Sequence, residues 1–435
     1  MTQTPPTSPP GGAPRLRLAD RQQVEFRMCC WNDLLPDDHQ ARIVWQYVKE
    51  MDLSPLLAEI KSVQNNAGHP ATDPKILAAL WLYATLRAIG SARELTRRCD
   101  PQTGEIPFQW ICGGVTVNYH TLADFRVQHL EFLDQFLTDS VAVLLQEELV
   151  TLDRSAQDGM KVRASAGAAS FRRKPTLDEH LEQARQQIQA LKDELQTDPA
   201  ACTARQKAAR ERAAREREER LQKAIEQQAE LEAQKKTAEK KENARASTTD
   251  PEARVMKMAD GGFRPAYNVQ LATDTQTQII TGVDVTNSGG DQGKMAPMVE
   301  QHQERYDETP NEMLVDGGYT KKEDIVAVSP PNGSTTVYAP VQVSKTSKRG
   351  AHEPRPDDKP AVAEWRQRMA TDEAKEIYKQ RAATAECVNA IARNRGLQQF
   401  RVRGRPKVRA VILWYVLAHN LMRTVALRAA AANGG

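Results

Sequence analysis

The sequence lacks the spacing patterns of metal modules and disulfide scaffolds. Six cysteines are spread over 435 residues without a C-x-x-C pair, and the eight histidines show no H-x(3–5)-H spacing. Neither a zinc module nor a disulfide framework is therefore indicated. We predict a reduced protein with a cytoplasmic location.

Aromatic residues and long apolar runs are also scarce. Phe, Trp and Tyr make up 5% of the chain, which argues against an aromatic-rich β-sandwich and favours helices or a mixed α/β fold. The longest apolar run, residues 410–418, is far shorter than a membrane span, and the first residues (MTQTPPTSPPGGAP) contain no apolar signal segment. We therefore expect a soluble protein with no membrane partner.

Neither sign of charge dominates the chain. The 60 Lys and Arg residues nearly balance 57 Asp and Glu residues, which leaves a net charge of +3. This balance excludes a uniformly polybasic nucleic-acid-binding protein, so any basic function must be local. The length is sufficient for several domains with their own cores.

The first two parts of the chain differ in composition. Residues 1–20 are rich in Pro, Gly, Thr and Ser, which predicts a disordered tail. Residues 21–150 repeat apolar positions at spacings of three and four, which predicts a helical domain. Short helices with glycine breaks, followed by Thr121–Arg126, fit a DNA-binding helix-turn-helix and also an ordinary helical bundle.

A long insertion over residues 176–246 consists mostly of Ala, Glu, Lys, Arg and Gln. Leu181, Ala184, Ile188, Leu191 and Leu195 follow the spacing of a coiled-coil seam. A helical hairpin within one chain and a dimerising coiled coil would both satisfy this pattern. We interpret the charged residues as a solvated helix face rather than a binding patch.

The remaining segments, 151–175 and 247–430, alternate between strand and helix patterns. We expect strands over 152–163, 267–273, 278–285, 312–316 and 335–341, and helices over 292–303, 321–327, 362–395 and 407–431. Without the insertion, this order predicts an α/β domain with a mixed sheet flanked by helices.

Three acidic residues stand where such a fold could bring them together. Asp158 lies in the first strand, Asp316 ends a buried strand, and Glu386 lies in a long helix. Phosphoryl transfer by two divalent ions needs a small cluster of carboxylates, because hard cations prefer oxygen ligands. Each residue also has an ordinary structural explanation: a hairpin turn at Asp158, a strand-ending turn at Asp316, and a solvated helix surface at Glu386.

Basic residues surround and follow Glu386. In one continuous helix, Lys379, Glu386 and Arg393 would form a single stripe, because residues seven apart differ by about 20°. The window that follows is the most basic in the chain and contains Arg395, Arg401, Arg403, Arg405, Lys407 and Arg409. The last five alternate, so in an extended segment they would point one way and could track DNA phosphates; the alternative is a solubilising linker.

Several of these segments together resemble a known family. The stretch from Tyr378 to Arg423, with TDPEAR (249–254), PAYNVQ (265–270) and the D-G-x-K-x-R-A of residues 158–164, resembles bacterial insertion-sequence transposases of the DDE class. The resemblance covers about residues 25–428. It implies an RNase H-like catalytic core, an N-terminal helical DNA-binding domain, and two Mg²⁺ ions, with Mn²⁺ as a substitute, held by Asp158, Asp316 and Glu386.

The resemblance also assigns residues that contact DNA. Tyr378, Arg381, Glu386 and Arg393 correspond to the Tyr-Arg-Glu-Lys/Arg signature of related transposases. Four residues separate Arg381 from Glu386, where the usual signature has three. Lys161 and Arg163, on the strand of Asp158, could contact the scissile phosphate. The role of the insertion is not implied.

The resulting hypothesis is a DNA transposase. It would bind the double-stranded ends of its mobile element, cleave them with metal-activated water, and join the freed 3′-hydroxyl to target DNA, with a homodimer as the active form. Two alternatives stay open. One is a catalytically inactive DNA-binding remnant of a transposase, and the other is a structural protein built around the 176–246 coiled coil.

Overall fold

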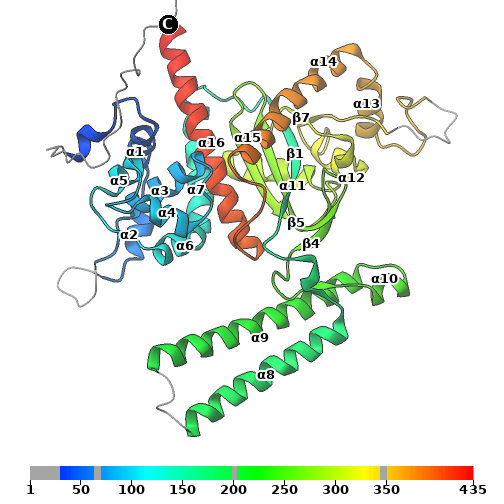
Figure 1. Ribbon diagram of the computed structural model, residues 1–435. Coiled ribbons are helices and arrows are strands. Elements are labelled where there is room, and N and C mark those ends of the chain that lie inside the picture. The colour runs from blue at the N-terminus through cyan, green and yellow to red at the C-terminus, as the bar shows by residue number, and fades with distance from the viewer. Residues whose placement is uncertain (1–29, 63–69, 198–202, 343–349, 435) are drawn as a thin grey trace, which may run out of the picture.

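The computed structural model describes residues 30–62, 70–197, 203–342 and 350–434 (Figure 1). The tail predicted over residues 1–20 lies outside these residues. Within them, a helical N-terminal part is followed by a mixed sheet with covering helices, and a long helical hairpin is inserted after the first strand of that sheet.

The N-terminal part contains the predicted helices. They are α1 (Gln40–Glu50), α2 (Ser54–Ala58), α3 (Pro74–Leu86), α4 (Ala92–Arg98), α5 (Ile106–Cys112), α6 (Tyr119–Gln128) and α7 (Leu130–Gln146). Helix α3 is the centre of this bundle. Asp73 caps its first turn by accepting from the Lys75 amide, and nearly every residue from Pro74 to Thr85 is buried. A helix that is apolar on all sides belongs in a core.

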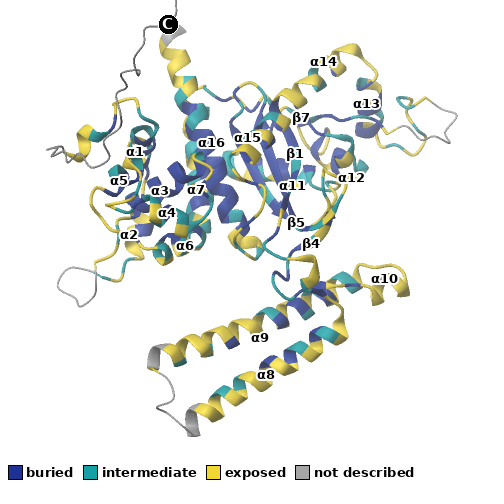
Figure 2. Cartoon of the chain, in the orientation of Figure 1, coloured by how far each residue is buried: buried dark blue, intermediate teal, exposed yellow. Residues whose placement is uncertain are grey.

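The final helix, α16 (Arg405–Gly434), joins the bundle to the sheet. It packs against α3, α6 and α7 on one side and against the sheet on the other (Figure 1). Its segment Arg405–Ala432 is long and apolar enough to cross a membrane, but 67% of the most apolar window is buried inside the protein. Figure 2 shows the same burial along the middle of this helix. Its hydrophobicity is thus accounted for by its place in the core.

The sheet contains six strands. They are β1 (Arg154–Arg163), β4 (Arg254–Lys257), β5 (Phe263–Asp274), β6 (Ile280–Thr286), β7 (Glu312–Leu314) and β8 (Thr336–Tyr338). Their order is β4-β5-β1-β7-β8, with β6 also paired to β5. Strands β4, β5, β6 and β1 are joined antiparallel, whereas β7 and β8 run parallel to β1. The mixed α/β sheet predicted from the sequence is therefore present.

Helices cover both faces of the sheet. One core joins the sheet to α11 (Met295–Tyr306), α12 (Lys322–Val328) and α13 (Pro360–Arg368). The other core joins it to α15 (Cys387–Asn394) and α16. Because successive strand residues face opposite sides, Asp158 faces α15, while its neighbours Gln157 and Gly159 face away from it.

The insertion forms a hairpin within one chain. Helices α8 (Lys174–Thr197) and α9 (Ala204–Ala233) lie antiparallel, followed by α10 (Ala238–Glu242) and closed at the base by the short pair β2 (Phe171–Arg172) and β3 (Ala246–Ser247). Leu181 and Ala184 of α8 pack against Leu221 and Ile225 of α9. The hairpin projects from the body of the protein and is mostly exposed (Figures 1 and 2). The first two residues of the predicted seam thus pack inside the chain, whereas Ile188 and Leu191 are only partly buried and the side chain of Leu195 lies outside the described residues.

Two predictions about the C-terminal region are wrong. The expected helix over 362–395 is interrupted: α13 ends at Arg368, Thr371 caps a new helix, α14 (Asp372–Arg381), and a π-helical turn (Ala382–Glu386) precedes α15. The interpretation of residues 401–409 as one extended basic row is also wrong, because the helix expected over 407–431 begins already at Arg405, with Pro406 in its first turn, a position that suits proline.

Candidate functional site

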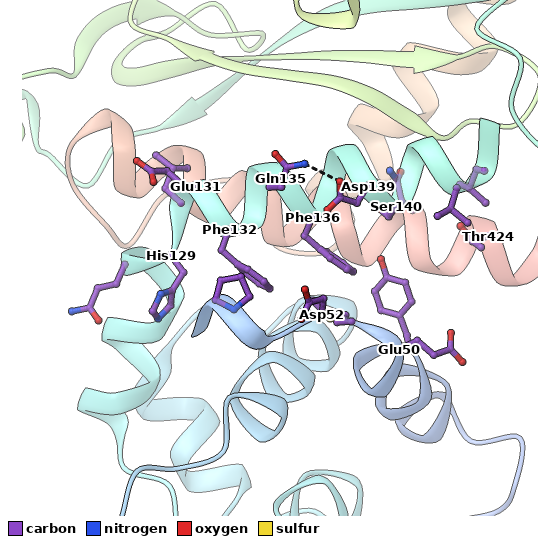
Figure 3. A pocket seen from close by; sticks show the side chains of 18 of the residues that line it. Glu50, Asp52, His129, Glu131, Phe132, Gln135, Phe136, Asp139, Ser140 and Thr424 are labelled. Atoms are coloured by element: carbon purple, nitrogen blue, oxygen red, sulfur yellow. Dashed lines mark hydrogen bonds between the residues drawn. The ribbon is translucent and has the colours of Figure 1, made fainter. Parts of the chain in front are cut away.

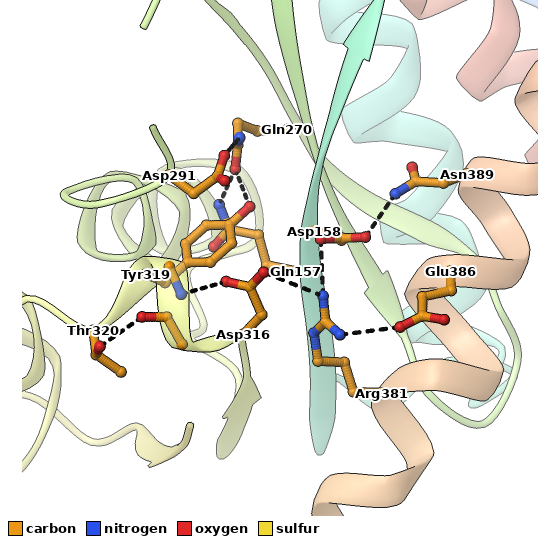
Figure 4. Close-up of polar contacts among 12 residues, drawn as sticks. Gln157, Asp158, Gln270, Asp291, Asp316, Tyr319, Thr320, Arg381, Glu386 and Asn389 are labelled. Atoms are coloured by element: carbon orange, nitrogen blue, oxygen red, sulfur yellow. Dashed lines mark hydrogen bonds and ion pairs between the residues drawn. The ribbon is translucent and has the colours of Figure 1, made fainter. Parts of the chain in front are cut away.

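The three predicted carboxylates come from three separate elements that meet at one place (Figure 4). Asp158 lies in the middle of β1, Asp316 is the second residue after β7, and Glu386 is the last residue of the π-helical turn. Strands β1 and β7 are parallel neighbours, which brings Asp316 beside β1. The Asp316 side chain is held by a hydrogen bond from the Gly318 amide, at 2.7 Å.

One guanidinium group, that of Arg381, lies among all three carboxylates. Its Nη2 lies 2.8 Å from Asp158 Oδ1 and 3.9 Å from Asp316 Oδ2, and its Nη1 lies 3.3 Å from Glu386 Oε1. Arg381 is the last residue of α14, one π-helical turn before Glu386. The structure therefore brings together Asp158, Asp316, Arg381 and Glu386, all of which the sequence proposed.

The four groups differ in their exposure to solvent. The Asp158 and Arg381 side chains are 18% and 11% exposed, whereas those of Asp316 and Glu386 are 41% and 59% exposed. Burial raises the pKa of the Asp158 carboxyl, and the charge of Arg381 only partly offsets this effect. The pKa of Arg381 is raised as well, because the nearby acidic groups outweigh its burial, which acts to lower it.

The π-helical turn accommodates the extra residue between Arg381 and Glu386. In a regular α-helix, residues five apart lie about 140° apart around the axis, so these two side chains would diverge. The wide turn instead leaves both on the face that looks toward β1. Asn389, one turn later in α15, shares this face and donates from Nδ2 to Asp158 Oδ2 at 2.9 Å. π-helical turns of this kind occur often at functional sites.

A second polar cluster lies beside β1 on the opposite face of the sheet. Asp291 Oδ1 accepts from Asn268 Nδ2 at 2.7 Å and from Gln270 Nε2 at 2.8 Å, and the Tyr319 hydroxyl donates to Gln270. Burial raises the pKa of Tyr319, and the charge of Asp291 adds to this rise. A Cβ at Gly159 would stand 2.4 Å from Asp291 Oδ1, so a larger residue at this strand position would displace the Asp291 side chain from its hydrogen bonds.

A basic groove lies next to this cluster. A cavity of about 600 Å³ is lined by Gly159, by Asp260 and Asp291, and by cationic side chains, of which Arg264 pairs with Asp260 at 2.7 Å. Those cations are Lys161, Arg163, Lys257, Arg264 and Arg393. Three of them were predicted to contact DNA, and the structure places these three in one groove.

Other predicted DNA-binding residues do not form the expected rows. Lys379 is exposed and pairs with Glu376, at 2.5 Å, and the π-helical turn breaks the stripe that was to connect it with Glu386 and Arg393. Tyr378 is partly buried and packs against the core that joins the sheet to α11, α12 and α13. Arg395 is half-buried and its pKa is lowered by burial.

The five alternating basic residues are likewise dispersed. Arg401 lines a separate cavity, Arg403 donates to the Ser165 carbonyl at 3.3 Å, and Arg409 pairs with Asp134 at 3.0 Å. The Arg405 amide donates to Glu252 at 2.8 Å, and Lys407 is exposed in the first turn of α16. The prediction that all five point one way is wrong, because helical geometry replaces the alternation from Arg405 onward.

The carboxylates fit a divalent cation by chemistry. Their donors are all oxygen atoms, as Mg²⁺ and Mn²⁺ prefer, and the exposed carboxylates of Asp316 and Glu386 leave access for water and phosphate. In the described part of the chain, however, no three acidic, histidine or cysteine side chains converge closely enough to hold a metal ion. The guanidinium of Arg381 lies among the three carboxylates, where it offsets part of their charge.

A different cavity is unsuited to DNA. It has a volume of about 970 Å³ between α1, α7 and α16 and is lined by Glu50, Asp52, Glu131 and Asp139 (Figure 3). Arg428, the one arginine in its lining, pairs with Glu147 at 2.9 Å. A cavity with this excess of carboxylates repels phosphate groups.

Sequence reasoning missed three residues around the cluster, namely Asn389, Asp291 and Tyr319. Asn389 could have been found, because it lies three residues after Glu386 and so on the same helix face. Asp291 and Tyr319 carry no such signal. Asp291 reaches the sheet from a loop, and Tyr319 lies in a short turn after Asp316, so their positions depend on the tertiary fold.

Comparison with protein families gives two matches. A family described as "Transposase DDE domain" matches residues 342–425, a segment that includes Arg381, Glu386 and Asn389. A family described as "Transposase domain (DUF772)" matches residues 29–128 in the helical N-terminal part. Searches of curated proteins and of solved structures found no match. Both family matches support the resemblance noted from the sequence, at its two ends.

Proposed function

We propose that this chain is an insertion-sequence transposase of the DDE class, as its two matched domains indicate. It would cleave and join DNA strands at Asp158, Asp316 and Glu386. The observation that carries this proposal is the meeting of three carboxylates from three elements around the single guanidinium of Arg381. A small cluster of carboxylates is what phosphoryl transfer by two divalent ions requires. The strand order, with three antiparallel connections followed by two parallel strands, also supports the RNase H-like interpretation.

The metal ions would be held by the same three carboxylates. Two Mg²⁺ ions, or Mn²⁺ in their place, would lower the pKa of the attacking water or 3′-hydroxyl and stabilise the leaving oxygen. The protein's own groups orient this site: Asn389 fixes Asp158 from α15, and the Gly318 amide fixes Asp316. With its guanidinium already at the cluster, Arg381 is placed to donate to the scissile phosphate.

Double-stranded DNA would lie along the basic groove beside Asp291, on the other face of β1 from Asp158. Lys161, Arg163 and Arg393 face this groove, and Lys257 of β4 extends it, whereas Arg264 is already paired with Asp260. Phosphate contacts of this kind position a strand without reading its sequence. The helical N-terminal part would recognise the ends of the mobile element. The homodimer and the cytoplasmic location stay predictions.

A strand-cleavage assay tests this function. The full chain is incubated with Mg²⁺ or Mn²⁺ and duplexes that carry the flanks of its own coding region. Asp316→Asn and Glu386→Gln should abolish metal-dependent breaks at defined positions. The matched control is Glu376→Gln, which removes an exposed carboxylate of α14 outside the cluster and should cleave like the wild type.

The same assay distinguishes the alternative, a catalytically inactive DNA-binding remnant. A remnant would bind the flanking duplexes in EDTA and yield no breaks with either metal. Cleavage that persists in Asp316→Asn and Glu386→Gln would show that the chemistry takes place elsewhere.

A further inference from the structure

A second cleft, distinct from the basic groove beside Asp291, lies between the helical N-terminal part and the part that carries the carboxylates. Its volume is about 930 Å³, and its walls come from α3, α4 and α6, the end of β1, and residues 396–402. Four arginines, Arg93, Arg126, Arg163 and Arg401, line it, and no aspartate or glutamate does. A cleft with this charge attracts an anion.

Arg126 is the strongest evidence for a ligand. This residue of α6 is 6% exposed, its guanidinium lies 4.5 Å from the ring centroid of Trp81, and its Nη1 donates to the Gly90 carbonyl at 2.7 Å. Its buried Nε has no hydrogen-bond partner, and no carboxylate pairs with it among the described residues. A buried cation without a counter-ion is costly, so its position indicates a group that is supplied from outside the chain.

The other arginines converge on the same place. The Arg401 side chain lies against Gly90, close enough that a Cβ there would be 3.7 Å from its Nε. Arg93 lies over the Tyr119 ring, with its guanidinium carbon 4.9 Å from the centroid. Burial lowers the pKa of Arg126 to about 10, and the like charge of Arg401 adds to this lowering. An anion in the cleft would relieve this repulsion.

The cleft adjoins the basic groove, because Arg163, Leu397 and Gln398 line both. Arg163 lies five residues after Asp158 on β1, a distance of about 17 Å at the usual rise of a strand. That distance corresponds to about five base-pair steps of 3.4 Å along B-DNA.

We propose that the cleft formed by Arg93, Arg126, Arg163 and Arg401 binds the phosphate backbone of DNA about five base pairs from the carboxylate cluster. This proposal rests on the proposed function, because it extends the same DNA path onto the helical part of the chain. A free phosphate or polyphosphate would present the same chemistry to the arginines. DNA is favoured because the cleft and the groove share Arg163, so their cations form one basic surface that could follow successive phosphates.

The test measures DNA binding in EDTA, so that it does not depend on cleavage. The probe is a duplex that carries one flank of the coding region, titrated at several salt concentrations. The double variant Arg93→Gln/Arg401→Gln changes two exposed cleft residues and leaves the buried Arg126 in place. Its matched control, Arg97→Gln/Arg428→Gln, removes the same charge from two arginines that pair with Glu94 and Glu147 outside the cleft.

We expect the cleft variant to bind the duplex roughly tenfold more weakly, with the slope of log K against log[salt] reduced by about 1.8, as for two lost phosphate contacts. The control should keep the wild-type slope. A cleft variant with wild-type affinity and slope would overturn the proposal, even if the wild-type protein cleaves DNA. A lost slope in a protein that never cleaves would support the cleft while refuting the catalytic proposal.

A second arm separates the two sources of phosphate. Inorganic pyrophosphate replaces DNA, and its effect on the thermal midpoint is measured. One outcome is that pyrophosphate stabilises the wild type but not the cleft variant, while both bind the duplex equally well. This result would assign the cleft to free phosphate and overturn its role in DNA binding. Weak stabilisation by pyrophosphate together with the reduced DNA slope supports the DNA path.

Discussion

Deleting one residue from the π-helical turn tests how the catalytic face is built. Ala382 is suitable, because its side chain is exposed in the first position of that turn. At 100° per residue, a regular helix would place Glu386 about 140° from Arg381, and one residue fewer reduces the angle to about 40°. The same deletion brings Asn389 from about 80° to about 20° from Arg381. The shortened helix should therefore present all three side chains to β1 without a wide turn.

We expect the Ala382 deletion to retain metal-dependent cleavage within about threefold of the wild type, since no contact of the cluster is lost. The opposite change, one alanine inserted after Ala382, rotates α15 by a further 100° or so relative to α14. Asp158 would then keep its bond from Arg381 or from Asn389, but not both. A hydrogen bond to a charged group is worth about 1.5–3 kcal/mol, so cleavage should fall about 10- to 100-fold.

Single-turnover cleavage of a flank duplex measures both variants, and the thermal midpoint establishes that each is folded. A deletion variant that is folded but inactive would refute this explanation, because the wide turn would then supply something other than spacing. An insertion variant with full activity would refute it equally, because the common face of Arg381, Glu386 and Asn389 would not matter.

Three further predictions concern the packing and the titration of the fold. Gly159→Ala should lower the free energy of unfolding, measured in urea titrations, by about 1–3 kcal/mol, because its Cβ would collide with Asp291. The control Gly167→Ala has open space around the new methyl group and should change this free energy little. Equal effects of the two substitutions would contradict the crowding at β1. Burial lowers the pKa of His302 to about 4, so below about pH 6.5 the unfolded chain binds a proton at this residue and the folded chain does not. About 3 kcal/mol of stability should therefore be lost as the pH falls from 6.5 to 4. A urea midpoint that stays constant over this range would refute the prediction. Leu181→Asp, in the seam between α8 and α9, should leave the molar mass from light scattering unchanged, and a fall to half would instead indicate a dimerising coiled coil.

Local patterns predicted most of the elements and the identity of the central residues. The periodicity of the sequence located five strands of the sheet, namely β1, β5, β6, β7 and β8. The positions of Asp158, Asp316 and Glu386 at strand and helix segments identified side chains that do meet. These features are readable because they depend on alternation along a strand and on turns at strand ends.

The rest depends on tertiary contacts that have no local pattern. The basic row from Arg401 to Arg409 failed because helix α16 starts inside it, and the alternation of charge says nothing about where a helix begins. The seam of residues 176–246 fits a hairpin and a dimer equally, since both bury the same side chains. The unpaired Arg126 is found only where two distant parts of the chain pack together.

The central claim is that Asp158, Asp316 and Glu386 hold the metal ions that cleave DNA, and anomalous diffraction from crystals grown with Mn²⁺ tests it most directly. We predict Mn²⁺ peaks about 2.1 Å from oxygen atoms of all three carboxylates, with the Arg381 guanidinium displaced from Asp158. A protein that cleaves DNA in solution while its crystals show Mn²⁺ bound elsewhere, with Arg381 still paired to Asp158, would contradict this account.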